Sequence, residues 1–325
     1  MALPSLWPTP IQEVLCPEAA SSGNRIFVKR DDLIPCALGG NKVRIAREFL
    51  SDMRARGCDA LVMYGDLRSN LCRVLAILCH RDQVPCLMIA TSEGDVAGRS
   101  FNQDVIGRLG VEVLECAKSD IAATVDLAFG RLTSRGLKPY YIYGDRTGSG
   151  NEGTAANAYA RAYGEICAQE DEPGERFDLI VTPYGTGCTQ GGLVCGSLCA
   201  NDNREIVGIS ISSRPRERAL SVLDDTVRSW FEREGRELPG DYQRHLNLQT
   251  AYTCGGYGVR NQRVDELIER MLLGEGLPLD PTYTGKAFRG MLDYLDDRGM
   301  RGKNVLFLHT GGTPLFYDYL LATRA

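Results

Sequence analysis

A lysine preceded by two glycines is the residue of this 325-residue chain best placed for covalent chemistry. Gly39 and Gly40 come directly before Lys42, and apolar residues recur with helical spacing from Val43 to Met53. Lys42 is therefore predicted near the start of a helix, where the macrodipole and burial both disfavour an ammonium. A neutral amine can attack a carbonyl and form a Schiff base. An ordinary surface lysine at a helix start is the alternative that this stretch alone leaves open.

A second glycine-rich segment follows a predicted strand at 177–182 and precedes a helix. It places unobstructed N–H groups and two hydroxyls at a helix N-terminus, which suits a phosphate; its residues are Gly185, Thr186, Gly187, Cys188 and Thr189. No lysine follows as in a P-loop, so the segment does not support triphosphate binding. The spacing of Gly185, Gly187 and Gly191 also approximates a dinucleotide fingerprint. An NADP-dependent reductase therefore remains an alternative.

Small polar and aromatic side chains occupy other predicted loops. Ser69 and Asn70 follow an apolar strand at 60–64, where they would cap a helix or hold a substrate carboxylate. Tyr257 lies between two glycines and Tyr283 lies in Pro-Thr-Tyr-Thr-Gly, so both hydroxyls are on loops. Thr310 ends the last apolar strand and would ordinarily cap a helix. Each of these residues alone is more commonly structural than functional.

The elements that position these residues alternate between strand and helix patterns. This alternation predicts an α/β fold with mostly parallel sheets, whose ligands bind beyond the carboxyl ends of the strands. A glycine-rich polar break at 144–151 is the best candidate for a crossing between domains. We predict a larger cofactor-binding domain from residues 1–45 and 151–325 and a smaller α/β domain from 46–150. The charged stretch from about 214 to 247 is predicted to be an exposed excursion.

The composition of the chain argues against several classes of binding partner. A formal net charge of -5 gives no electrostatic footprint for nucleic acid, and no apolar run reaches the roughly 20 residues that cross a membrane. The 12 cysteines lie in apolar patterns without a Cys-x-x-Cys pair, and His80, His245 and His309 are far apart. We therefore predict no metal site, no nucleic-acid or membrane partner, and reduced thiols in a cytoplasmic protein.

Six motifs occur together and in order along the chain. They are Leu38-Gly39-Gly40-Asn41-Lys42-Val43-Arg44, Ser69-Asn70, the segment 185–192, Gly256-Tyr257-Gly258, Tyr283-Thr284-Gly285-Lys286 and His309-Thr310-Gly311-Gly312. Together they resemble the D-cysteine desulfhydrase and 1-aminocyclopropane-1-carboxylate deaminase family of pyridoxal-phosphate enzymes, from about Pro8 to Tyr319. The resemblance implies the two-domain fold type II, similar to the tryptophan synthase β subunit, with pyridoxal 5'-phosphate as cofactor. It also implies a small amino-acid substrate and a homodimer.

The resemblance also implies roles for individual residues. Lys42 would be the internal Schiff-base lysine with Asn41 beside the cofactor ring, and residues 185–189 would cradle the cofactor phosphate. Ser69 and Asn70 would hold the substrate carboxylate, and Ser69 is also a candidate for proton transfer. Tyr257 and Tyr283 match the active-site tyrosines of the family. Thr310 would face the pyridine nitrogen.

Two threonines favour one of the family's two activities. The deaminase type resembles Tyr-Glu-Gly at the position of Tyr283-Thr284-Gly285, with an apolar residue at position 310, whereas Thr284 and Thr310 match the desulfhydrase type. A hydroxyl near the ring nitrogen suits elimination of a β leaving group better than opening of a carbon ring. The prediction is α,β-elimination on D-cysteine or an analogue, giving pyruvate and ammonia. A β-replacement synthase and ring opening remain alternatives.

The chain departs from the family pattern on the substrate side. Asp66 and Arg68 stand where the family usually has glycine and glutamine, and Leu71 replaces a polar residue. We place Arg68 and Leu71 in the substrate site. Arg68 would pair with a second anionic group of the substrate, such as a sulfonate or carboxylate, or else point to solvent.

Overall fold

The computed structural model describes residues 7–91, 100–171 and 175–323. Its ten strands form two sheets: β1 (Ile11–Val14), β2 (Arg25–Arg30), β3 (Ala60–Gly65), β4 (Cys86–Thr91), β5 (Glu112–Cys116), β6 (Pro139–Tyr141), β7 (Leu179–Tyr184), β8 (Glu205–Ser210), β9 (Asn247–Gln249) and β10 (Asn304–His309). The larger sheet has the order β1-β2-β10-β7-β8-β9, and the smaller one β5-β4-β3-β6. Every pairing is parallel except that of β1 with β2. This confirms the predicted α/β class with mostly parallel sheets.

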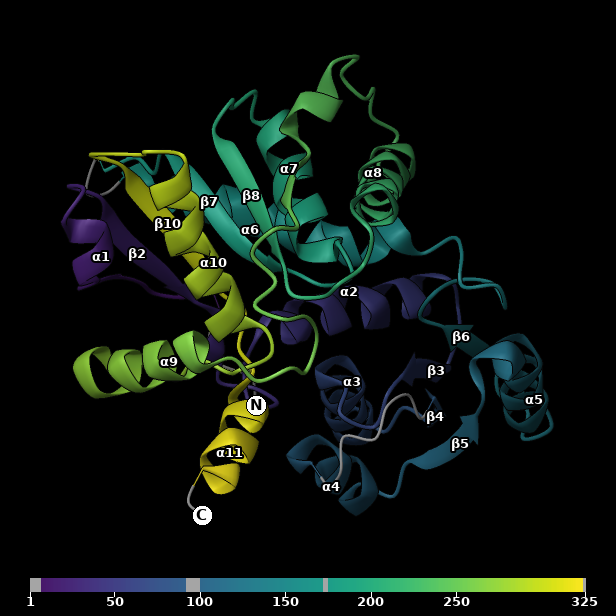
Figure 1. The fold of residues 1–325 in the computed structure, drawn as a ribbon. Coiled ribbons are helices and arrows are strands. Elements are labelled where there is room, and N and C mark those ends of the chain that lie inside the picture. Colours follow the sequence, from purple (N-terminus) through teal and green to yellow (C-terminus); the bar gives the residue numbers. More distant parts are fainter. Residues whose placement is uncertain (1–6, 92–99, 172–174, 324–325) are drawn as a thin grey trace.

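Helices cover both faces of the larger sheet (Figure 1). The α-helices of the described residues are α1 (Pro17–Ala20), α2 (Asn41–Ala55), α3 (Asn70–Arg81), α4 (Phe101–Arg108), α5 (Ile121–Thr133), α6 (Glu152–Asp171), α7 (Cys188–Cys199), α8 (Arg216–Arg233), α9 (Gln262–Glu275), α10 (Thr284–Asp297) and α11 (Thr313–Ala322). Helices α6, α7 and α8 pack together on one side, and α9 and α10 lie on the other.

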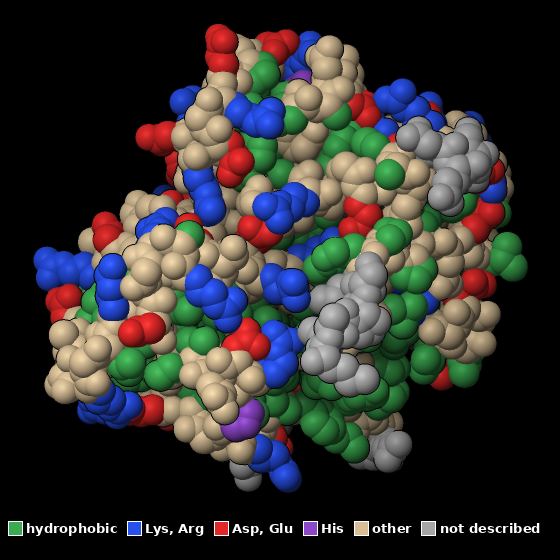
Figure 2. Space-filling view, turned by 180° about the vertical axis from the view of Figure 1, so that it is seen from behind, with side chains coloured by type: hydrophobic (Ala, Val, Ile, Leu, Met, Phe, Trp, Pro, Cys, Tyr) green, Lys and Arg blue, Asp and Glu red, His purple; other side chains and the backbone are tan. Residues whose placement is uncertain are grey.

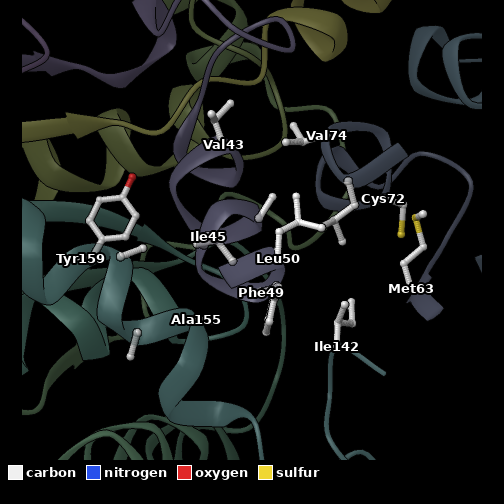
Figure 3. Packing of buried hydrophobic residues seen from close by; sticks show 14 of the residues in the cluster. Val43, Ile45, Phe49, Leu50, Met63, Cys72, Val74, Ile142, Ala155 and Tyr159 are labelled. Carbon is white, nitrogen blue, oxygen red and sulfur yellow. The ribbon is translucent and has the colours of Figure 1, made fainter. Parts of the chain in front are cut away.

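Helix α2 joins the two sheets through the core. Its buried residues, among them Phe49 and Leu50, belong to one hydrophobic cluster with α6 and with the strands of the smaller sheet. Figure 3 shows these side chains between Tyr159 of α6 and Val74 of α3. A separate cluster fills the space between the larger sheet and α9 and α10. Lys42 therefore projects from a helix that is held firmly at both sides.

The predicted domain division stays a prediction. Strands β3 to β6 all lie between residues 60 and 141, and the strands of the larger sheet come from the chain on either side of that range. No helix of the described residues is long and apolar enough to cross a membrane. On the face in Figure 2, Lys and Arg side chains are interspersed with Asp and Glu.

The prediction of an exposed excursion at 214–247 was wrong. Helix α8 buries an apolar stripe that includes Leu223, Val227 and Trp230, and it packs on α6 and α7. The charged residues between these positions occupy the solvent side of the helix. They interrupt the apolar pattern in the sequence, so the buried stripe was not predicted. The short polar strand β9 then extends the sheet beside β8.

Candidate active site

The predicted residues gather around one cavity of about 340 Å³, a size that suits a small ligand. Helix α2 supplies Asn41 and Lys42 to its wall, and the start of α3 supplies Ser69, Asn70 and Leu71. The segment Gly185 to Thr189, both tyrosines and Thr310 complete most of the predicted set. Residues far apart in the sequence thus meet where strands end and helices begin.

Gly40 allows the loop after β10 to pack closely against the loop that carries Lys42. The N–H of Gly40 donates to the carbonyl of Asp31 at 2.8 Å, and the N–H of Asn41 donates to the carbonyl of Thr310 at 3.0 Å. Gly40 has a φ of +93°, and a Cβ added there would lie 2.9 Å from the Thr310 carbonyl oxygen. Any other residue would be strained and would push Thr310 away from the site.

The environment of Lys42 favours the uncharged form of its amine. Burial lowers the pKa of Lys42, and the nearby Cys188 thiol opposes this effect only in part. No carboxylate of the described residues forms an ion pair with Lys42. The predicted neutral amine therefore has a physical cause in the structure.

The segment before α7 forms an anion cradle. Gly187 adopts a φ of +87° immediately before the helix, and the first N–H groups of α7 have no acceptor within the helix. A Cβ added to Gly185 would meet only the Tyr283 ring, at 3.8 Å, so the backbone is open toward the cavity. The side-chain amide of Asn41 donates to Thr189 Oγ1 at 3.1 Å and ties the cradle to α2. These donors fit a phosphate group.

The start of α3 forms the opposite wall. Ser69 Oγ accepts the N–H of Cys72 at 3.2 Å as the helix cap. The side-chain amide of Asn102, which is fully buried on α4, donates to Asn70 Oδ1 at 3.0 Å and to the Arg68 carbonyl at 2.6 Å. Asn102 thus fixes the turn that presents Ser69 and Asn70, a role that no sequence motif indicated.

The two predicted tyrosines form a pair. The hydroxyl oxygens of Tyr257 and Tyr283 lie 3.1 Å apart, and their rings meet edge to face at 76°. Burial raises the pKa of Tyr283 well above its usual value, and the Tyr257 hydroxyl adds a smaller increase. The pair therefore remains protonated at neutral pH and can donate a hydrogen bond into the cavity.

The sequence model for "Pyridoxal-phosphate dependent enzyme" matches residues 2–311 of the chain. This chain belongs to that family. It is 33% identical over 323 residues to a Pyrococcus abyssi protein named "Putative 1-aminocyclopropane-1-carboxylate deaminase", covering 96% of this chain and 92% of that protein. A crystal structure described as an ACC deaminase homologue is 30% identical and superimposes with a TM-score of 0.81, covering 97% of this chain and 94% of the other. These relatives confirm the predicted family, its fold type II and its cofactor, pyridoxal phosphate.

The fold is also shared with a more distant protein. The structure of a hydrogen sulfide-producing enzyme from Fusobacterium nucleatum superimposes with a TM-score of 0.64 at 16% identity, covering 96% of this chain and 97% of the other. At that identity the similarity supports the fold only.

One residue predicted to contact the cofactor, Thr284, does not line the cavity of this pyridoxal-phosphate enzyme. Its hydroxyl is fully buried, donates to Asp280 Oδ2 at 2.7 Å and accepts the N–H of Asp280 at 2.8 Å. Thr310, by contrast, does line the wall, as predicted. Thr284 is turned away because it closes the first turn of α10 together with Asp280.

Asp280 is a cavity residue that the sequence reading missed. This fully buried carboxylate accepts the N–H groups of Thr282, Tyr283 and Thr284. Burial raises the pKa of Asp280, and these bonds oppose the increase. Its position ahead of a helix, in Asp-Pro-Thr-Tyr-Thr, is typical of a residue that caps a helix N-terminus. This pattern could have indicated Asp280 from the sequence.

Arg68, predicted to bind the substrate, also lies outside the cavity wall. One guanidinium nitrogen of Arg68 is buried without a hydrogen-bond partner among the described residues. Burial raises the pKa of Asp318 on α11, and the charge of Arg68 opposes this increase in part. The backbone N–H of Arg68 donates to Asp66 Oδ1 at 2.7 Å. The charge of Arg68 acts on both Asp318 and the cavity residue Tyr257, so the guanidinium lies near the cavity without lining it.

Proposed function

We propose that this chain is a lyase that carries out α,β-elimination on a small amino acid with a β leaving group, such as D-cysteine. The supporting observation is that an amine with a lowered pKa, Lys42, shares one cavity with a helix N-terminus at Ser69 and with the protonated tyrosine pair. These groups correspond to a base, a carboxylate site and hydrogen-bond donors. The products would be pyruvate, ammonia and the leaving group.

Bound pyridoxal phosphate supplies the electron sink for the carbanion. The chain supplies binding and orientation. The cradle at 185–189 would hold the phosphate, Lys42 would hold the reactive carbon, and Thr310 would face the ring nitrogen. The N–H groups at the start of α3 would orient the substrate carboxylate.

Lys42 is the better of the two predicted bases. Ser69 Oγ accepts a hydrogen bond from Cys72 N, and no basic side chain of the described residues is bonded to its hydroxyl. A serine without such a partner is a weak base, whereas Lys42 has a lowered pKa. We infer that Lys42 removes the α proton and that Ser69 positions the carboxylate.

The tyrosine pair would face the β substituent. A protonated hydroxyl on the way out of the cavity can donate to a departing thiolate. The Cβ–S bond breaks with its electron pair on sulfur as the Cα–Cβ double bond forms. One water then releases pyruvate and ammonia, which balances the reaction.

Ring opening of 1-aminocyclopropane-1-carboxylate is a second candidate. It is favoured by the name of the Pyrococcus abyssi relative and by the buried Asp280 carboxylate at the cavity wall. A carboxylate near the ring nitrogen strengthens the electron sink, which this harder reaction requires.

A product screen separates these reactions. The purified enzyme with its cofactor is given D- and L-cysteine, β-chloroalanine and 1-aminocyclopropane-1-carboxylate. Pyruvate with sulfide from cysteine supports elimination, and 2-oxobutyrate from the cyclopropane supports ring opening. A new amino acid formed only when a thiol is added indicates β-replacement. Turnover that requires NADPH would contradict all three proposals.

We also propose that the enzyme is a homodimer, as the family resemblance implies. Light scattering of the purified protein tests this directly, and a mass of one chain would contradict it.

A further inference from the structure

A carboxylate without a counter-ion lines the active-site cavity. Asp66 directly follows β3, and its side chain shares the wall with Tyr257 and Tyr283. Asp66 Oδ1 accepts the N–H of Arg68 at 2.7 Å, and its carbonyl accepts the N–H of Ser69 at 3.0 Å. These two bonds fix the turn, so the carboxylate is held beside the start of α3.

No cation of the described residues pairs with Asp66. Lys42 would be bonded to the cofactor. The guanidinium of Arg214 donates to the carbonyl of Gly185 at 3.5 Å, beside the proposed phosphate site. The Arg68 guanidinium lies outside the wall. A partly buried carboxylate with no partner is costly, and a ligand that brings a positive charge offsets this cost.

We propose that Asp66 selects amino acids whose β substituent is a cation, with 2,3-diaminopropionate as the simplest example. This inference rests on the proposed elimination function and specifies its substrate class.

The positions of the other groups direct the β substituent toward Asp66. With the α-carboxylate at the start of α3 and the α-nitrogen at the cofactor, the tyrosine pair and Asp66 are among the polar groups left in the wall for the β substituent. Burial raises the pKa of both tyrosines, and the negative charges of Asp66 and Asp280 add to this increase. At Tyr257 the positive charge of Arg68 opposes it. The electrostatic effect of Asp66 is consistent with a carboxylate that faces the two hydroxyls. A β-ammonium there would form a charge-assisted hydrogen bond to Asp66.

The elimination balances for this substrate. Lys42 takes the α proton, the Cβ–N bond breaks with its electron pair on nitrogen, and ammonia leaves as the Cα–Cβ double bond forms. One water then converts the remaining three-carbon unit to pyruvate and releases the second ammonia. No oxidant or reductant is required.

Binding is measured first, because it does not depend on elimination. The absorbance change of the bound cofactor is followed as 2,3-diaminopropionate or alanine is added, in both D and L forms, at neutral pH. Loss of one charge-assisted hydrogen bond corresponds to about a 10- to 100-fold change in affinity. The wild type should prefer one form of 2,3-diaminopropionate over alanine by about this factor, and Asp66→Asn should lose the preference.

Two further variants make the comparison specific. Asp66→Asn keeps an oxygen that accepts the Arg68 N–H, and Asp66→Ser serves if the asparagine variant folds poorly. Asp318→Asn removes the same charge from α11, outside the cavity, and should keep the preference.

Turnover is measured second, with β-chloroalanine as a substrate whose β substituent carries no charge. Asp66→Asn should lower kcat/KM for 2,3-diaminopropionate about 10- to 100-fold and change that for β-chloroalanine less than about threefold. The proposal is overturned if the wild type binds alanine as tightly as 2,3-diaminopropionate or binds neither, or if Asp66→Asn keeps the preference. Preferential binding without pyruvate from any substrate would instead refute the proposed elimination and leave the selectivity established.

Discussion

The side-chain amide of Asn41 donates to Thr189 Oγ1 at 3.1 Å, which joins the residue beside Lys42 to the phosphate cradle. The two residues are 148 positions apart in the sequence, and both are buried. The bond therefore fixes the distance between the two points at which we propose that the cofactor is held. Such preorganisation raises affinity because less ordering remains to be done on binding.

Asn41→Ala should weaken the affinity for pyridoxal phosphate about fivefold, the effect of one lost hydrogen bond of about 1 kcal/mol. Fluorescence titration of the apoenzyme with the cofactor measures this. Thr189→Val and the double variant complete a cycle, and the two effects should be less than additive because the residues share one bond. Full additivity would show that the bond does not contribute.

Lys42→Ala should abolish the yellow absorbance band of the bound cofactor and lower kcat by at least about a thousandfold. The variant loses the amine that we propose both holds the cofactor and acts as the base. Lys303→Ala, which changes an exposed lysine paired with Asp178, is the control and should keep the band and the rate. Survival of both colour and rate in Lys42→Ala would show that the lysine is wrongly assigned.

A buried ionic cluster supports the loop that carries Lys42. Arg44 donates to Asp31 at 2.9 Å and to Glu165 at 2.8 Å, and the Asp31 carbonyl accepts the N–H of Gly40. Arg44→Ala should reduce the free energy of unfolding by about 3–5 kcal/mol, because it leaves buried carboxylates without their partner. Arg25→Ala, which breaks exposed pairs, should cost about 1 kcal/mol or less. Urea denaturation compares the two, and equal losses would contradict the role of burial.

The same cluster predicts the acid stability of the enzyme. Burial alone would raise the pKa of Glu165, but Arg44 and Lys29 lower it to about 2. A depressed pKa stabilises the fold above the usual pKa of 4.5, and this contribution is lost as the pH falls from there through about 2. The wild type should lose stability across this window, and Arg44→Ala should lose less. Thermal unfolding at several pH values checks the difference.

The glycine segment at 185–192 was predictable because it follows a continuous apolar run, and parallel strands bring their carboxyl ends to one edge. Lys42 could be placed in a site only because six motifs together resemble the family, since its own stretch left a surface lysine open. The direction of a side chain at such an edge could not be predicted from the sequence. Thr284 bonds to Asp280, four residues earlier, at the first turn of α10, and the Arg68 guanidinium lies outside the cavity wall. Thr310 was expected to cap the helix after the last strand, whereas α11 begins at Thr313, with Gly312 as its cap residue and Pro314 in its first turn.

The tyrosine pair gives the last prediction. Tyr283→Phe should lower kcat/KM about 10- to 100-fold while the cofactor affinity stays unchanged, because the Tyr283 hydroxyl is the more enclosed donor at the leaving group. Tyr257→Phe should have a smaller effect, since that side chain is 49% exposed and water can replace its hydroxyl.

Steady-state assays of pyruvate formation compare these variants with Tyr252→Phe. The Tyr252 hydroxyl donates to Asp297 at 2.9 Å at the surface, so its removal should leave kcat/KM unchanged. A leaving group of low basicity needs little help from a donor, and the loss in Tyr283→Phe should therefore shrink with β-chloroalanine relative to cysteine. An equal loss with both substrates would mean that Tyr283 positions the substrate and does not assist the departure of the leaving group.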